Sequence, residues 1–247
     1  MSMYSWENHW KRQKAAPVLD AYGSRAYAAF GKWIEGRRIL EVGFGTGRFL
    51  KKISDENKGS LLVGVEHSIS AMKSMRMHSR DIILVRADMF NLPFKDGAFD
   101  TVLNEGVIIY YKNYKEALKE IIRVGKSTVT CVTNLYNIPF TIYRKLRGKN
   151  FEYGWEKAFT GKELKDLYES LGMTGMEIEG YYPAHSVKRI SGFPFVVFTY
   201  PAGLLIDFIA SIADKLTKNA FSRAFGFYIC IRGYKKLPSK NDRTSLA

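Results

Sequence analysis

The first residues that could do chemistry are three glycines within five positions, in the stretch Glu41-Val-Gly43-Phe-Gly45-Thr-Gly47. Glycines after a strand let a ligand approach the backbone, and the helix that follows presents free N–H groups. A dinucleotide-binding loop needs Gly or Ala three residues after its second glycine, where Arg48 stands here. The spacing therefore argues against a pyrophosphate-binding loop. A tight turn without a ligand is the alternative, although such a turn needs only one glycine.

Two acidic residues end or follow the next two apolar runs. Glu66 stands 19 residues beyond Gly47, where a carboxylate can accept hydrogen bonds from both hydroxyls of a ribose. A nicotinamide-dependent dehydrogenase would use the same device. Asp88 follows the third run, where a carboxylate can accept a hydrogen bond from a purine amine. Either acid alone could be an ordinary loop residue, but in this order we expect both to converge on one crevice.

Alternating strands and helices must position these residues. Strands are expected at 38–43, 61–66, 82–87, 99–104, 127–133, 176–182 and 227–233. Helices are expected after Pro17, after the glycine loop, at 69–78 and around 114–122, and one at 160–172 carries Thr160 as N-cap, Glu163 three residues on and Gly172 as terminator. This alternation predicts an α/β fold with an open, mainly parallel sheet covered on both faces. We expect a single domain over 1–237 and a frayed tail at 238–247.

Four stretches together resemble the class I S-adenosylmethionine (SAM)-dependent methyltransferases. They are 39–50, Val65-Glu66-His67-Ser68, Ala87-Asp88-Met89 and 92–103. The resemblance is to the broad group of ubiquinone/menaquinone-biosynthesis-type (methyltransferase type 11-like) enzymes, over roughly 35–135 and extending to about 182. It implies a Rossmann-like, doubly wound seven-stranded sheet with an antiparallel last strand. It also implies SAM as cofactor and S-adenosyl-L-homocysteine as product.

The resemblance assigns a role to each matching residue. Gly43, Phe44, Gly45 and Gly47 would lie against the methionine and ribose moieties, Glu41 near the methionine amine, Glu66 on the ribose hydroxyls, and His67 beside the adenine. Asp88 and the Met89 backbone would bind the adenine edge, and Asn104 and Glu105 would lie beside the sulfonium and the acceptor.

Methyl transfer from a sulfonium needs little beyond holding the acceptor in line, because the donor is already activated. A base is needed only where the acceptor must lose a proton. The candidates are Glu105, Tyr110, Tyr111 and His185, each of which could instead line the site or lie on the surface. We recognise no cluster of metal ligands and expect no metal.

Composition gives a soluble globular protein of 247 residues, with 46% hydrophobic and 25% charged residues. Lys and Arg number 38 against 24 Asp and Glu, which leaves a formal charge of +14. The densest basic cluster, 144–149, is either a solvated loop or a nucleic-acid surface, so an RNA-directed methyltransferase or a basic nucleic-acid-binding protein is the rival hypothesis. The two cysteines and the absence of an apolar leader in 1–16 favour a cytoplasmic protein.

The segment 193–213 carries one charge, Asp207, and is long enough to span a membrane. Pro194, Pro201 and a polar stripe that starts beyond Ala202 instead favour an amphipathic helix over the acceptor. Peripheral membrane contact through 193–218 is the second interpretation and a true span the third. We expect covers at 1–35 and 183–225, and a small or amphiphilic acceptor.

Overall fold

The computed structural model describes residues 6–12, 21–57, 59–79, 81–137, 141, 145, 156–181, 212–218, 220–226 and 228–236. Seven strands form one sheet in the order β3-β2-β1-β4-β5-β7-β6. The strands are β1 (Arg38–Val42), β2 (Leu61–Glu66), β3 (Ile83–Arg86), β4 (Phe99–Glu105), β5 (Gly125–Thr133), β6 (Met173–Tyr181) and β7 (Tyr228–Lys235).

The first five strands pair with one another in parallel, and β7 lies between β5 and β6 and is antiparallel to both. Parallel strands buried on both faces read as continuous apolar runs, as β1 and β2 do in this chain. The expected mainly parallel sheet with an antiparallel last strand is confirmed.

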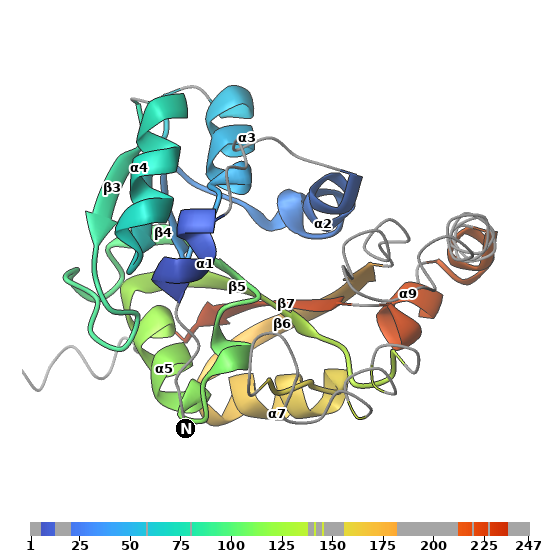
Figure 1. Cartoon of the computed structure of the whole chain (residues 1–247). Coiled ribbons are helices and arrows are strands. Elements are labelled where there is room, and N and C mark those ends of the chain that lie inside the picture. The colour runs from blue at the N-terminus through green and yellow to red at the C-terminus, as the bar shows by residue number, and fades with distance from the viewer. Residues whose placement is uncertain are drawn as a thin grey trace, which may run out of the picture.

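Helices cover the two faces of the sheet, with α2 (Ala21–Phe30), α3 (Arg48–Glu56) and α4 (Ile69–His78) on one face and α5 (Tyr114–Val124) and α7 (Gly161–Ser170) on the other (Figure 1). The remaining labelled elements are α1 (Trp6–Arg12), η1 (Gly31–Trp33), η2 (Ile108–Tyr110) and α9 (Ala220–Phe225). One hydrophobic cluster lies on each face, and they are centred on α3 and on α5 and α7.

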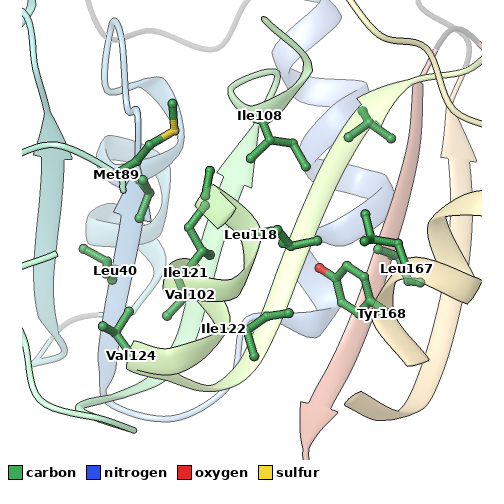
Figure 2. Close-up of a cluster of buried hydrophobic side chains, with 14 of the residues drawn as sticks. Leu40, Met89, Val102, Ile108, Leu118, Ile121, Ile122, Val124, Leu167 and Tyr168 are labelled. Carbon is green, nitrogen blue, oxygen red and sulfur yellow. The ribbon is translucent and has the colours of Figure 1, made fainter. Parts of the chain in front are cut away.

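The cluster beneath α5 and α7 shows how the amphipathic helices are fixed to the sheet. Leu118 and Ile121 of α5 face the sheet near Val102 of β4, and Leu167 of α7 lies beside Tyr168 further along the sheet (Figure 2). Burying apolar surface of this kind is the main favourable contribution to folding. It holds the carboxyl ends of the strands in fixed positions.

Local signals placed several element ends correctly. Thr160 and Glu163 form the expected capping box, and Gly172 follows α7 with φ of 77°. The predicted start of β6 was wrong, because the strand begins at Met173 rather than at position 176. A register shift between Thr174 and Glu177 interrupts the alternation that a sequence pattern relies on.

Several predicted features lie outside the described residues. These are His185, the tail at 238–247, residues 13–20 and most of the 183–225 insert. The described end of that insert holds a short helix over 212–217, and Lys218 then adopts φ of 50° before α9. In the described part of the chain, no helix has the length and apolar character needed to cross a bilayer.

Candidate active site

The glycine loop connects β1 to α3 and is a tight turn with three positive φ angles, 71° at Gly43, 54° at Gly45 and 74° at Gly47. A side chain at any of the three would also collide with a neighbour. A Cβ at Gly43 would meet Val107, one at Gly45 would lie 2.7 Å from Trp10, and one at Gly47 would meet Met75. Backbone conformation and packing therefore both favour glycine at each of the three positions. The glycines by themselves do not establish a ligand.

The carboxylate of Glu66 joins this loop to the end of β2. Its Oε2 accepts a hydrogen bond of 3.1 Å from the backbone N–H of Gly45, and its Oε1 accepts from the N–H groups of His67 and Ser68 at 2.8 and 3.0 Å. The residue is buried, whereas His67 is exposed. Two residues that the sequence singled out, Gly45 and Glu66, are thus in direct contact.

Asp88 lies one strand further along the same edge, directly after β3. Its Oδ1 accepts from the N–H of Phe90 at 3.0 Å, and Met89 beside it is buried in the core. Burial raises the pKa of Tyr111, and the charges of Glu66 and Asp88 raise it further. Tyr111 is therefore close enough to both carboxylates for their charges to raise its pKa. The ends of β2 and β3 thus lie near the same side chain.

Glu41, at the carboxyl end of β1, is fully buried. Its Oε2 accepts a hydrogen bond of 3.2 Å from the backbone N–H of Leu50. Burial raises its pKa to about 8, the charge of Glu105 adds to this, and Arg48 acts in the opposite direction. Glu41 is thus a buried acid whose ionisation can respond to a charge brought near it.

Glu105 ends β4 and is held by two side chains that sequence reasoning missed as site residues. Arg48 Nη2 lies 3.3 Å from its Oε2, and the hydroxyl of Tyr181 donates to Oε1 at 3.4 Å. Tyr181 is buried and stacks on Tyr228, with ring centroids 5.7 Å apart. In the sequence, Arg48 stands out only because it departs from the glycine spacing of a dinucleotide-binding loop. No sequence signal links Tyr181 to Glu105.

Asn104 precedes Glu105 and is fully buried. Its amide nitrogen donates to the Thr130 hydroxyl at 2.7 Å and to the Val129 carbonyl at 3.3 Å. Within the described residues, its Oδ1 has no hydrogen-bond partner. A buried acceptor without a partner is costly, so this oxygen is suited to receive a donor from a ligand.

A second group of residues that the sequence did not reveal as part of the site belongs to α1. The ring of Trp6 lies 4.9 Å from that of Tyr110, and Glu7 accepts hydrogen bonds from the hydroxyls of Ser68 and Ser70. Together with the contact of Trp10 on Gly45, these interactions place α1 against the glycine loop, the start of α4 and η2. Of the predicted bases, Tyr110 and Tyr111 contact Trp6 of α1, Glu105 ends β4, and His185 falls outside the described residues.

Residues 40–133 match a family model described as a methyltransferase domain. The match begins in β1 and ends with β5, so it includes the glycine loop, Glu66, Asp88 and Glu105. These residues form a methyltransferase domain. The resemblance noted in the sequence is confirmed over this part of the chain.

Parts of the chain are similar in sequence to two curated methyltransferases. A demethylmenaquinone methyltransferase from Roseiflexus sp. (strain RS-1) is 29% identical over 99 residues, which are 38% of this chain and 42% of that protein. A malonyl-(acyl-carrier protein) O-methyltransferase from Legionella pneumophila is 32% identical over 116 residues, which are 45% of this chain and 41% of that protein. The chain thus spans less than half the length of these two relatives.

The fold likeness extends further than the sequence likeness. A solved SAM-dependent methyltransferase from Thermotoga maritima matches with a TM-score of 0.60 at 19% identity, over 86% of this chain and 88% of that chain. The sheet and the helices around the methyltransferase domain therefore have the fold of SAM-dependent methyltransferases.

The polar groups at the strand ends of the methyltransferase domain fit such a cofactor. SAM carries hydrogen-bond donors at its ammonium group, its ribose hydroxyls and its adenine amine. The domain offers acceptors in Glu41, Glu66, Asp88 and the unpartnered Oδ1 of Asn104. The described residues contain no group of three or more His, Cys, Asp or Glu side chains arranged to hold a metal ion.

Proposed function

We propose that this protein is a SAM-dependent methyltransferase that acts on a small or amphiphilic acceptor. The observation that carries the proposal is the hydrogen bond from Gly45 to Glu66, because it joins the loop after β1 to the acid that ends β2. A dinucleotide enzyme would share that acid, but Arg48 stands where its loop would need Gly or Ala. The match of residues 40–133 to a methyltransferase domain supports the same conclusion.

Each side chain has a proposed task. Glu66 binds the ribose hydroxyls, Asp88 the adenine amine, and Glu41 and Asn104 face the methionine end. When bound, the cofactor supplies a methyl group on a positively charged sulfur. Glu105 is the proposed general base for a methyl acceptor that carries N–H or O–H, and Arg48 forms an ion pair with its carboxylate.

An amphiphilic acceptor is favoured by exposed apolar residues near the end of β5 and around α9. They are Leu135, Tyr136, Ile212, Leu216 and Phe225. Asn134 and Asn137 donate to carbonyls at the end of α9, and Asp214 bonds Ser222 within it, so these segments lie together. Lys215 and Lys218 are exposed on the same segment. Apolar residues flanked by lysines suit the surface of an anionic membrane.

We further propose that the protein is cytoplasmic and contacts the inner face of a membrane through this apolar surface. The nucleic-acid alternative has no supporting contact within the described residues. Most of its basic cluster, 144–149, lies outside them.

Calorimetric titration with SAM and with S-adenosylhomocysteine tests the cofactor. We expect micromolar binding that Glu66→Ala abolishes and that Glu116→Ala retains, since Glu116 is an exposed acid in the first turn of α5. Absence of binding by folded wild-type protein would overturn the proposal. Methyl-labelled SAM with lipid and metabolite extracts then identifies the acceptor class by where the label is recovered.

Flotation with liposomes tests the membrane contact. We expect association with anionic vesicles and little with neutral ones, and a loss of association in Leu216→Ser. Met77→Ser is the matched control, because Met77 is 83% exposed on α4 and Leu216 is 80% exposed. Equal behaviour of the two variants would refute the membrane contact and leave the transferase proposal standing.

A further inference from the structure

Helix α1 contacts three separate parts of the candidate site. Trp10 lies against Gly45 in the glycine loop, Trp6 packs on Tyr110 in η2, and Glu7 bonds residues at the start of α4. These parts follow the carboxyl ends of β1, β4 and β2, in that order. Figure 1 shows α1 beside α4, in agreement with the contacts between the two helices. The helix therefore bridges the strand ends where the cofactor is proposed to bind.

Glu7 links α1 to the start of α4 through three hydrogen bonds. Oε2 of Glu7 accepts from the hydroxyl of Ser68 at 2.7 Å and from the backbone N–H of Ser70 at 3.3 Å, and Oε1 accepts from the hydroxyl of Ser70 at 2.5 Å. These hydrogen bonds lower the pKa of Glu7 to about 2. The negative charge also lies at the N-terminus of α4, where the helix dipole favours it.

The aromatic residues of α1 add contacts that are less directional than the hydrogen bonds of Glu7. Trp6 hydrogen-bonds Tyr111, the residue that senses both Glu66 and Asp88, and its ring stacks near Trp10 with centroids 6.5 Å apart. Trp6 thus lies next to the proposed ribose and adenine positions and Trp10 next to the glycine loop. No residue of α1 is fully buried, so surface contacts such as these and the Glu7 hydrogen bonds hold the helix in place.

We propose that α1 is a closable cover over the cofactor site and that Glu7 is the positioning residue that holds it closed on α4. The inference rests on the proposed function, since it assumes that a cofactor binds beneath the helix. A ligand must pass the same cover in both directions. Weakening the Glu7 contacts therefore raises both the association and the dissociation rate constants.

Stopped-flow tryptophan fluorescence with S-adenosylhomocysteine tests the cover on the full chain. We expect Glu7→Ala to raise both rate constants roughly threefold to tenfold, which corresponds to the loss of exposed charge-assisted hydrogen bonds. Glu7→Gln should fall between wild type and Glu7→Ala, because the amide keeps one acceptor oxygen. Glu116→Ala is the control and should leave both rates unchanged.

A double-mutant cycle with Ser70 makes the test specific to this contact. Ser70→Ala removes the hydroxyl that bonds Oε1, while Ser68, which caps α4 through the N–H of Ala71, is left in place. We expect Ser70→Ala to change the rates in the wild type and to have no further effect in Glu7→Ala. Additive effects, or an unchanged rate constant in Glu7→Ala, would overturn the cover.

Different outcomes would refute the proposed function and the proposed cover. Wild-type protein that is folded but binds neither SAM nor S-adenosylhomocysteine overturns the proposed function and the cover with it. Wild-type protein that binds, with Glu7→Ala showing wild-type rates in both directions, overturns the cover alone. Thermal unfolding of each variant, with transitions near that of wild type, separates a change in the cover from a loss of the fold.

Discussion

Glu66 and Gly45 are 21 positions apart in the sequence, yet a hydrogen bond of 3.1 Å joins the backbone N–H of Gly45 to the Glu66 carboxylate. The parallel pairing of β1 with β2 brings the two together, since both strands end at the same edge of the sheet. Two more backbone N–H groups, from His67 and Ser68, point at the same carboxylate. These three backbone donors fix the acid in place and leave one of the carboxylate's roughly four lone pairs for a ligand donor.

Replacing Glu66 by Gln should therefore cost both stability and cofactor binding. The amide turns one acceptor oxygen into a donor that opposes a backbone N–H. We expect a loss of about 1–3 kcal/mol in the free energy of unfolding and roughly tenfold weaker binding of S-adenosylhomocysteine. Urea unfolding and calorimetry measure the two effects, and Glu116→Gln serves as control. Wild-type values for Glu66→Gln would contradict the assignment.

The buried acid Glu41 predicts a dependence of stability on pH. Its pKa is raised to about 8 in the fold, above the ordinary value of 4.5, so the unfolded chain ionises first as pH rises. Its contribution to stability is therefore fully present below about pH 4.5 and is lost as pH rises through about 8. We expect wild type to lose up to roughly 3 kcal/mol relative to Glu41→Gln between about pH 5.5 and about pH 8.5.

Urea unfolding of both proteins across this range measures the difference. Using Glu41→Gln as the reference removes the contribution of the other titrating groups, which the two proteins share. Parallel stability curves would show that Glu41 does not titrate in this window.

Arg48 should contribute more than an ordinary surface cation, because it is the partner of the largely buried Glu105 carboxylate. Arg48→Met should destabilise the fold by about 1–3 kcal/mol, since it leaves that carboxylate without its cation. Lys162→Met is the matched control, because its ion pair with Asp166 is exposed and such pairs contribute little. Urea unfolding near pH 7 compares them, and equal effects would argue against a special role for Arg48.

Gly47 and Gly172 offer a comparison at nearly equal backbone angles, 74° and 77°. An alanine at either position adopts a disfavoured left-handed conformation, which costs about 1–2 kcal/mol. At Gly172 the new methyl group meets nothing within 4 Å, whereas at Gly47 it collides with the buried Met75. We therefore expect Gly47→Ala to be the more destabilising by at least about 1 kcal/mol in urea unfolding. A reversed order would contradict the packing of Met75 on the loop.

Much of the fold was predictable from the sequence, because its signals act over a few residues. The apolar runs of β1 and β2, the glycine loop between β1 and α3, and the capping box of Thr160 and Glu163 each depend on neighbouring positions. The order of acids after successive strands was equally local. It was enough to bring Glu66 and Asp88 to one edge of a parallel sheet.

The start of β6 was the exception among the local features. A register shift near Thr174 breaks the period-two pattern, and only the pairing with β7 shows that the strand begins earlier.

Contacts between distant residues were decided by the tertiary structure alone. Arg48 and Glu105 are 57 positions apart, Tyr181 and Glu105 are 76 apart, and Glu7 and Ser68 are 61 apart. No short-range pattern encodes such pairs, since they depend on the pairing of β1 with β4, on the insertion of β7 between β5 and β6 and on the docking of α1. The sequence by itself determined which residues stand at the strand ends, and the packing of the whole chain determined which side chains hold and cover them.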